Sequence, residues 1–254
     1  MRDLVAERDP QLLQRCVELV GEDPFARVEE NTRFAQPAIF CASLAGWDAL
    51  GLRPAAAAGH SLGELAALAA AGVLAREDAL RLVVLRGRLM GQARNGSMLA
   101  LVGASLEDAE AIAADAGVTV ANDNAPGQVV LSGDRAALER AEALAAERGR
   151  RALALDVAGA FHSPAMEPAV APFRAALDEV ELGEPEFPVF SCASAAPFED
   201  VRDELAAALT RPVRWRETVL ALHDAGARDF VEVGPGQVLT RMNKRILKDV
   251  PAHA

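Results

Sequence analysis

The sequence is poor in cysteine, has no long apolar run and carries no excess of positive charge. Its three cysteines, Cys16, Cys41 and Cys192, lie far apart in apolar surroundings. Their number and spacing match neither a disulfide framework nor a zinc site. We therefore expect buried, reduced thiols, no bound metal and a cytoplasmic protein.

Two other classes of protein are also disfavoured. Apolar stretches such as Leu65 to Leu74 are too short to span a bilayer, and residues 1–9 lack the apolar core of a secretory signal. The net charge of −11 gives no indication of binding to nucleic acid or to an anionic membrane. What remains is a globular chain of 254 residues, 51% hydrophobic and 25% charged, long enough for one or two domains.

Helical patterns alternate with short apolar runs along the chain, which is typical of an α/β protein. In the first part we expect helices at 38–50, after Pro37, at 62–71 and at 76–94. The run Ala55 to Ala58 is ambiguous. Alanine favours helix, whereas Pro54 and Gly59 on either side favour a short buried strand.

The middle of the chain has a different order of elements. We expect strands at 97–102, 118–121, 128–132 and 151–155, with helices at 106–114 and 136–148. This βαββαβ order is that of a ferredoxin-like unit. We therefore predict a small domain at 96–157, inserted between residues 1–95 and 158–254 of a larger one.

The last part of the chain returns to the alternating pattern. The expected helices are at 164–177, 199–209 and 216–225, and the expected strands are at 187–192 and 229–233. A Gly234-Pro235-Gly236 turn and a final helix from Gln237 follow.

A G-x-S-x-G motif, Gly59-His60-Ser61-Leu62-Gly63, stands at the junction of a strand and a helix. Small residues allow the sharp, strained turn that presents a nucleophilic serine. The following helix N-terminus favours an oxyanion. A serine that merely caps a helix after a glycine turn gives the same pattern, so the motif alone leaves both interpretations open.

A nucleophilic serine needs a base, and the chain has four histidines. His60 sits inside the turn, where packing is the expected role; His223 lies near the end of an amphipathic helix, where we expect a surface position; and His253 is in the tail. His162 lies in a loop between a strand and a helix, where functional residues concentrate. By elimination, His162 is the best candidate base.

With these residues in view, the chain resembles the malonyl-CoA:acyl carrier protein transacylase family and the acyltransferase domains of polyketide synthases. Several independent motifs carry the resemblance in the right order along nearly the whole chain. They are Ala35-Gln36-Pro37-Ala38, Gly59-His60-Ser61-Leu62-Gly63-Glu64, Leu85-Arg86-Gly87, Ala121-Asn122-Asp123-Asn124-Ala125-Pro126-Gly127-Gln128, Gly159-Ala160-Phe161-His162-Ser163-Pro164, Arg211-Pro212-Val213-Arg214-Trp215 and Glu232-Val233-Gly234-Pro235-Gly236.

The resemblance implies an α/β-hydrolase-like core with a short parallel sheet, and it assigns roles to individual residues. Ser61 matches the acylated nucleophile, His162 the general base, and Arg86 the arginine that grips the free carboxylate of the malonyl group. The further matches are the Leu62 backbone N–H in the oxyanion hole, the Ala208 carbonyl that orients the histidine, and Gln36, His60 and Phe161 beside the substrate. Without the resemblance, Arg86 reads as a solvated charge on a helix face.

At two positions the chain departs from the family pattern. The histidine-orienting carbonyl usually belongs to a glutamine, and here the residue is alanine. Family members also open with a strand and a Gly-Gln-Gly turn whose glutamine N–H completes the oxyanion hole, and this sequence begins after that point. We therefore expect a chain that is N-terminally shortened relative to the family. Losing one such donor typically costs a hundred- to a thousandfold in turnover.

The resemblance thus implies a cofactor-independent malonyltransferase of fatty acid or polyketide synthesis that uses malonyl-CoA and acyl carrier protein and is a monomer. Two alternatives stay open. A serine esterase or thioesterase would need an acidic triad member, for which Asp156 is the candidate. A catalytically impaired protein that still binds the carrier protein is the other.

Overall fold

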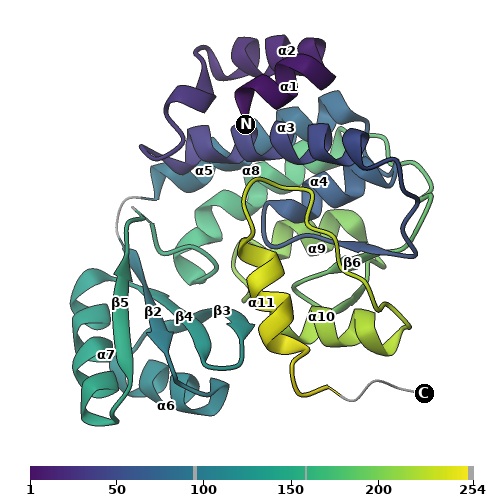
Figure 1. Ribbon diagram of the computed structural model, residues 1–254. Helices are drawn as coiled ribbons and strands as arrows, with labels where there is room; N and C mark the ends of the chain where they lie inside the picture. The colour runs from purple at the N-terminus through teal and green to yellow at the C-terminus, as the bar shows by residue number, and fades with distance from the viewer. Residues whose placement is uncertain (94–95, 158, 251–254) are drawn as a thin grey trace.

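The computed structural model describes residues 1–93, 96–157 and 159–250. Helices form the upper part of the molecule in Figure 1, and two separate sheets lie below them. The first sheet has three strands and the second has four. Arg94 and His253, which entered the sequence predictions, lie outside the described residues.

The first part of the chain is mainly helical. Its elements are α1 (Arg2–Arg8), α2 (Pro10–Val20), the 3₁₀ turn η1 (Pro24–Ala26), α3 (Thr32–Leu50), β1 (Ala57–Ala58), α4 (Gly63–Ala70) and α5 (Arg76–Gln92). The ambiguous alanine run is therefore the strand β1. The start of α3 was wrongly predicted, since Pro37 lies inside the helix. The Asn31 side chain accepts a hydrogen bond from the Arg33 N–H and so caps the helix further upstream.

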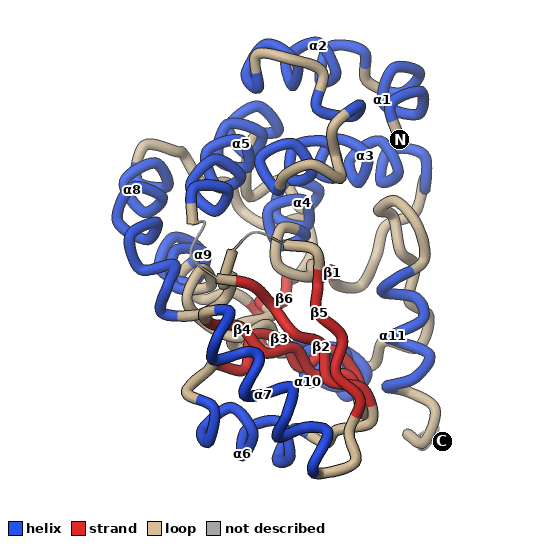
Figure 2. The backbone as a smooth tube through the Cα atoms, turned by 90° about the vertical axis from the view of Figure 1, so that its left-hand side faces the viewer, coloured by secondary structure: helices blue, strands red, loops and turns tan. Residues whose placement is uncertain are grey.

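The middle of the chain forms the four-stranded sheet. Its elements are β2 (Ser97–Val102), α6 (Leu106–Ala116), β3 (Thr119–Ala125), β4 (Gln128–Gly133), α7 (Arg135–Glu147) and β5 (Arg151–Leu155). The strand order is β3-β4-β2-β5 with antiparallel pairs throughout. Helices α6 and α7 cover one face of this sheet (Figure 2). The element types and the βαββαβ order agree with the sequence prediction.

The last part of the chain completes the three-stranded sheet. Its elements are the 3₁₀ turn η2 (Pro164–Met166), α8 (Glu167–Asp178), β6 (Val189–Ser191), β7 (Ala196–Pro197), α9 (Val201–Ala207), α10 (Trp215–Asp224) and α11 (Val238–Ile246). Strand β1 runs parallel to β6, and β7 is antiparallel to β6. The order β1-β6-β7 leaves β1 at the edge of this sheet.

The predicted strand at 229–233 is wrong. These residues form neither helix nor strand. An apolar pattern such as Phe230-Val231-Glu232-Val233 forms a strand only where a neighbouring strand supplies hydrogen bonds. Within the described chain no ladder partner lies beside it, and Val231 is 59% exposed.

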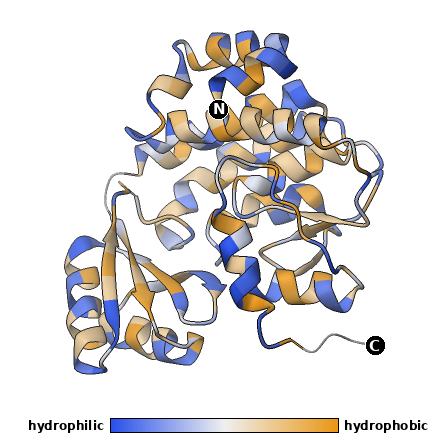
Figure 3. Ribbon diagram, viewed as in Figure 1, coloured by the Kyte–Doolittle hydropathy of each residue, from blue (hydrophilic) through white to orange (hydrophobic). Residues whose placement is uncertain are grey.

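Apolar side chains gather in three buried clusters. The largest lies among α3, α4, α5, α8 and the three-stranded sheet, a second lies between α6, α7 and the four-stranded sheet, and a third lies around α10 and α11. Figure 3 shows β2 and β4 as mainly hydrophobic, whereas α11 carries a strongly hydrophilic stretch. In the described residues no helix is long and apolar enough to cross a membrane.

Strand β3 also contacts the segment before α10, where Asn122 pairs with Val213. The strand runs four residues beyond its predicted end at Ala121. Three of these four, Asn122, Asp123 and Asn124, are polar and yet buried. The Asp123 N–H donates to the Val213 carbonyl at 2.9 Å, and the Asp123 carboxylate accepts from Arg216 at 2.8 Å. Polar residues extend this strand because partners outside their own sheet satisfy them.

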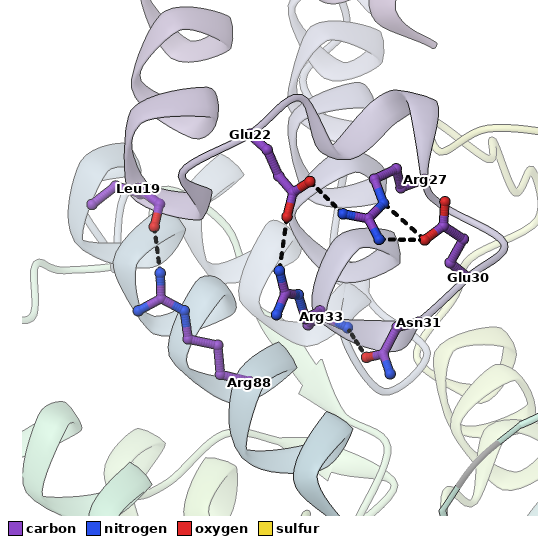
Figure 4. A network of polar contacts seen from close by, with 7 residues as sticks. All are labelled: Leu19, Glu22, Arg27, Glu30, Asn31, Arg33 and Arg88. Carbon is purple, nitrogen blue, oxygen red and sulfur yellow. Dashed lines mark hydrogen bonds and ion pairs between the residues drawn. The ribbon is translucent and has the colours of Figure 1, made fainter.

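An exposed network joins the segment after α2 to α3 and α5 (Figure 4). We call it the surface arginine network; its residues are Leu19, Glu22, Arg27, Glu30, Asn31, Arg33 and Arg88. Glu22 bridges Arg27 and Arg33, and Glu30 pairs with Arg27 at 2.6 Å. The network therefore neutralises most of its own charge.

Candidate active site

The turn between β1 and α4 has the strained backbone that the G-x-S-x-G motif predicts. Ser61 adopts a φ of 54°, in the left-handed region that non-glycine residues rarely occupy. A Cβ atom on Gly59 would lie 1.8 Å from the Gly63 carbonyl carbon, so only glycine fits there. The turn thus places the Ser61 hydroxyl just before the first turn of α4.

His162 reaches this hydroxyl from the loop before η2. The distance from Ser61 Oγ to His162 Nε2 is 2.8 Å, although the two residues are 101 positions apart. On the other side of the ring, Nδ1 lies 2.9 Å from the Ala208 carbonyl oxygen and 3.2 Å from that of Arg211. Carbonyl oxygens only accept, so Nδ1 carries the proton and Nε2 is free to accept one.

The surroundings keep this imidazole neutral. Burial, and next the positive charge of Arg86, lower the pKa of His162 to about 3. A neutral ring is the form that can take a proton from the serine. Asp156 is exposed, and His162 Nδ1 hydrogen-bonds to two backbone carbonyls, so no Ser-His-Asp triad forms with Asp156.

Arg86 is the main cation of the site. Its side chain comes from α5, is only 4% exposed, and donates to Ser61 Oγ at 2.9 Å and to Gln36 Oε1 at 2.8 Å. Burial lowers its pKa to about 10, and the negative charge of Glu64 opposes this shift. Arg86 is therefore charged at neutral pH. In the part of the chain that the structure describes, no carboxylate forms an ion pair with it.

Gln36 holds the guanidinium of Arg86 in place. It is 5% exposed on α3, and its Nε2 donates to Thr32 Oγ1 at 2.9 Å and to Met90 Sδ at 3.2 Å. With both ends of the amide engaged, Oε1 is aimed at Arg86. The guanidinium is thereby held beside Ser61.

The remaining predicted residues lie around this centre. Leu62 is the residue just before α4, and its N–H has no backbone acceptor among the described residues. The His60 ring faces β3 instead of the serine hydroxyl: its Nε2 lies 2.7 Å from Asn124 Oδ1, and the ring packs beside Trp215. Phe161 is buried directly before His162.

Sequence reasoning missed several residues of the site. Glu64 and Asn124 are buried polar residues in direct contact with the motif segments, and the Arg211 carbonyl is a second acceptor for His162. The signal for the first two was present, because both stand inside matching motifs. His223, expected at the surface, is only 6% exposed, because it lies on the inner face of α10.

Within the described residues, no group of three or more His, Cys, Asp or Glu side chains is arranged to hold a metal ion. All three cysteines are buried and free. The groups that the structure brings together at the site are the Ser61 hydroxyl, the His162 imidazole and the Arg86 guanidinium.

Two relatives have sequences similar to that of this chain. A malonyl CoA-acyl carrier protein transacylase of Haemophilus influenzae is 40% identical over 92% of this chain and 80% of its own length. The polyketide biosynthesis protein ThaF of Burkholderia thailandensis is 36% identical over 94% of this chain, which spans only 22% of that protein.

Solved structures agree closely with the fold. The malonyl-CoA:acyl carrier protein transacylase FabD of Xanthomonas oryzae pv. oryzae matches with a TM-score of 0.90 and 37% identity, over 98% of this chain and 87% of that one. A malonyl-transacylase solved in complex with a type II polyketide synthase acyl-carrier protein matches with a TM-score of 0.89 and 34% identity, over 97% and 85%. The model of the acyl transferase domain matches residues 11–254, and the chain therefore belongs to the acyl transferase domain family.

Proposed function

We propose that this protein transfers a malonyl group from malonyl-CoA to the phosphopantetheine thiol of an acyl carrier protein, through a malonyl ester on Ser61. The observation that carries the proposal is the hydroxyl of Ser61, bracketed by the base His162 and the buried cation Arg86. The similarity to transacylases, one of them solved with a carrier protein, supports the choice of substrate and acceptor.

In the first half-reaction, the Ser61 oxygen attacks the thioester carbonyl while its proton passes to His162 Nε2. The tetrahedral intermediate collapses, the carbon–sulfur bond breaks, and the coenzyme A sulfur leaves with the proton from the imidazolium. In the second half-reaction the phosphopantetheine thiol gives its proton to His162, attacks the ester carbonyl, and the serine hydroxyl is restored.

Arg86 binds the free carboxylate of the malonyl group in this mechanism. A buried, charged guanidinium with no ion pair among the described residues attracts an anion, and its planar fork suits a carboxylate. Gln36 keeps the fork aligned. The Leu62 N–H, at the start of α4, donates to the oxyanion of the tetrahedral intermediate. Phe161 and His60 shape the surrounding wall.

The carbonyls at Nδ1 distinguish this proposal from the esterase alternative. A serine hydrolase of the α/β-hydrolase type orients its histidine with a carboxylate. Here the Ala208 and Arg211 carbonyls occupy that position. A backbone acceptor fixes the tautomer without stabilising the imidazolium by a full negative charge.

Mass spectrometry of the acyl-enzyme tests the proposal. Mixed with malonyl-CoA and no acceptor thiol, the protein should accumulate a malonyl adduct on Ser61, and Ser61→Ala should accumulate none. His162→Ala should slow the acylation by about 10²- to 10⁴-fold. Rapid release of free malonate would favour the esterase, and absence of any adduct would favour a carrier-protein-binding protein without activity.

The proposal includes a division of the fold. We assign residues 96–157 to a ferredoxin-like small subdomain, supported by the antiparallel order β3-β4-β2-β5 and the two helices on one face. Residues 1–95 and 158–254 then form a large subdomain with an α/β-hydrolase-like core, supported by the parallel pair β1 and β6 and by the elbow between β1 and α4.

For the acidic carrier protein we propose the basic side of α11 as the docking surface. Its last turn carries Lys244 and Arg245, and the helix lies beside β3 and α10, at the junction of the proposed subdomains (Figure 1). Arg86 itself cannot take part in docking, since its side chain is buried. A monomeric state and a cytoplasmic location stay predictions.

A further inference from the structure

Glu64 is a buried carboxyl group that the mechanism above does not use. It lies in the first turn of α4, three residues after Ser61, and is 1% exposed. Its Oε1 accepts a hydrogen bond from the Cys192 N–H at 2.7 Å. The Ser191 hydroxyl and the Cys192 thiol favour its charged form. A carboxylate held this way beneath the nucleophile needs an explanation beyond capping, because burying a charge is costly.

Glu64 and Arg86 are both buried near Ser61. Neither forms a direct ion pair among the described residues, yet each acts on the charge of the other. They thus form a separated pair whose net charge is zero when both are ionised. Such an arrangement leaves the guanidinium free to take another anion, which a direct salt bridge would prevent.

A third charge changes this balance. When a carboxylate binds to Arg86, the site contains two negative charges and one positive charge in surroundings of low dielectric constant, where repulsion is poorly screened. We propose that Glu64 is the counter-charge of Arg86 and takes up one proton from solvent when the acyl carboxylate binds, so that the occupied site returns to neutrality. This inference rests on the proposed function, since it needs a substrate that carries a carboxylate.

The titration of Glu64 supports the proposal. Burial raises its pKa to about 7, against the opposing effects of Cys192, Ser191 and Arg86. Arg86 comes from α5, and Cys192 follows β6. Helix α3 and strand β1 also pack against α4, but in the described chain no charged group from either bonds to Glu64. Burial likewise raises the pKa of the Cys192 thiol, so that thiol stays protonated.

The sign of the expected pH effect follows from linkage. A substrate carboxylate beside Arg86 removes the field that favours the ionised form of Glu64, so binding raises the pKa of Glu64 further. Binding is then strongest below pH 7 and weakens as the pH rises above 7. His162, with a pKa of about 3, stays neutral across this range and does not contribute.

Titration calorimetry on the Ser61→Ala protein measures this, because malonyl-CoA can bind there without being transferred. We expect uptake of about 0.5 proton at pH 7 and about 0.9 at pH 8, from experiments in buffers of different ionisation enthalpy. The Kd should rise about tenfold between pH 6 and pH 8. Acetyl-CoA, which has the same phosphates and no free carboxylate, is the control and should show neither effect.

The double variant Ser61→Ala with Glu64→Gln gives the matched comparison. Glutamine keeps an oxygen that accepts from the Cys192 N–H, but it cannot titrate. Its Kd for malonyl-CoA should stay flat between pH 6 and pH 8. A purely structural Glu64 would instead change affinity equally at every pH. Should the double variant fail to fold, proton uptake by the Ser61→Ala protein still decides.

Two failures can be told apart. Malonyl-CoA that binds to the Ser61→Ala protein with no proton uptake and a pH-independent Kd overturns the role of Glu64 and leaves the proposed function intact. If the unmodified protein forms no malonyl ester on Ser61, the proposed function itself is wrong.

Discussion

The surface arginine network and the buried Arg86 differ in what surrounds their guanidinium groups. In the surface arginine network (Figure 4), the Arg27 and Arg33 side chains are 39% and 47% exposed, and Glu22 bridges them. In the candidate active site, Arg86 is 4% exposed and donates hydrogen bonds to the Gln36 amide and the Ser61 hydroxyl. Arg27 and Arg33 already pair with carboxylates, whereas Arg86 has no direct carboxylate partner among the described residues.

The difference shows how to distinguish a binding arginine from a structural one. Exposed ion pairs contribute little to stability because water and salt screen them. A buried cation without an ion pair costs free energy in the empty protein, and an anionic ligand recovers part of that cost on binding. Burial together with the absence of a direct counter-ion therefore singles out Arg86.

Among the variants that test this comparison, Arg86→Ala should have the largest effect. Losing a charge-assisted bond worth about 1.5–3 kcal/mol should lower kcat/KM for malonyl-CoA by about 10- to 150-fold. Acylation by acetyl-CoA, which has no carboxylate, should fall much less, so the preference for malonyl should disappear. Competing acylation of Ser61 by the two thioesters measures this.

Arg81→Ala is the matched control for that variant. Arg81 stands on the same helix, is 54% exposed and pairs with Glu77. It should keep the malonyl preference. If Arg86→Ala also kept the malonyl preference, this guanidinium would not bind the substrate carboxylate. The contrast between Arg86 and the surface arginines would then have no functional meaning.

An intermediate effect is expected for Gln36→Ala. The variant removes the bond from Gln36 Oε1 to Arg86 but leaves the charge in place. Hydrogen bonds to charged groups contribute about 1.5–3 kcal/mol, but this one only positions the guanidinium, so we expect part of that amount to be lost and kcat/KM for malonyl-CoA to fall about 2- to 12-fold. Steady-state kinetics with both thioesters will show whether the loss is specific to malonyl. A loss as large as that of Arg86→Ala would mean that Gln36 itself binds the substrate.

The smallest effect is expected for Arg27→Ala in the surface arginine network. Its pairs with Glu22 and Glu30 are exposed, so the thermal unfolding midpoint should fall by no more than about 2 °C. Malonyl transfer should be unchanged. Calorimetry at low and high salt, with the transfer assay beside it, checks both points. A clear loss of transfer would show that the surface arginine network affects the candidate active site.

Much of the fold could be predicted from local patterns. Strands β2, β4 and β5 of the small antiparallel sheet were predicted to within one residue, because the strands alternate with capped helices such as α6, which begins at the Ser105 capping box. The errors fall where distant segments decide. The extension of β3 depends on Val213 and Arg216, and the segment 229–233 has the composition of a strand but no neighbouring strand in the described chain.

The candidate site divides in the same way. The sharp turn at Ser61 could be predicted from the sequence, because the small residues on both sides permit a positive φ independently of the rest of the fold. His162 followed from elimination and from the resemblance. Its second carbonyl partner, and the contact between His60 and Asn124, were not readable, because they join elements 49 and 64 residues apart.

The sequence by itself determined the family, the strained serine turn and the alternation of helices and strands, since each depends on residues close together in the chain. Only the tertiary structure decided which charges face one another. Arg86 and Glu64 become a separated pair because folding buries both near Ser61 and directs their hydrogen bonds elsewhere. The strength of an interaction between two charges depends on their burial and on the distance between them, and neither can be predicted from the local sequence.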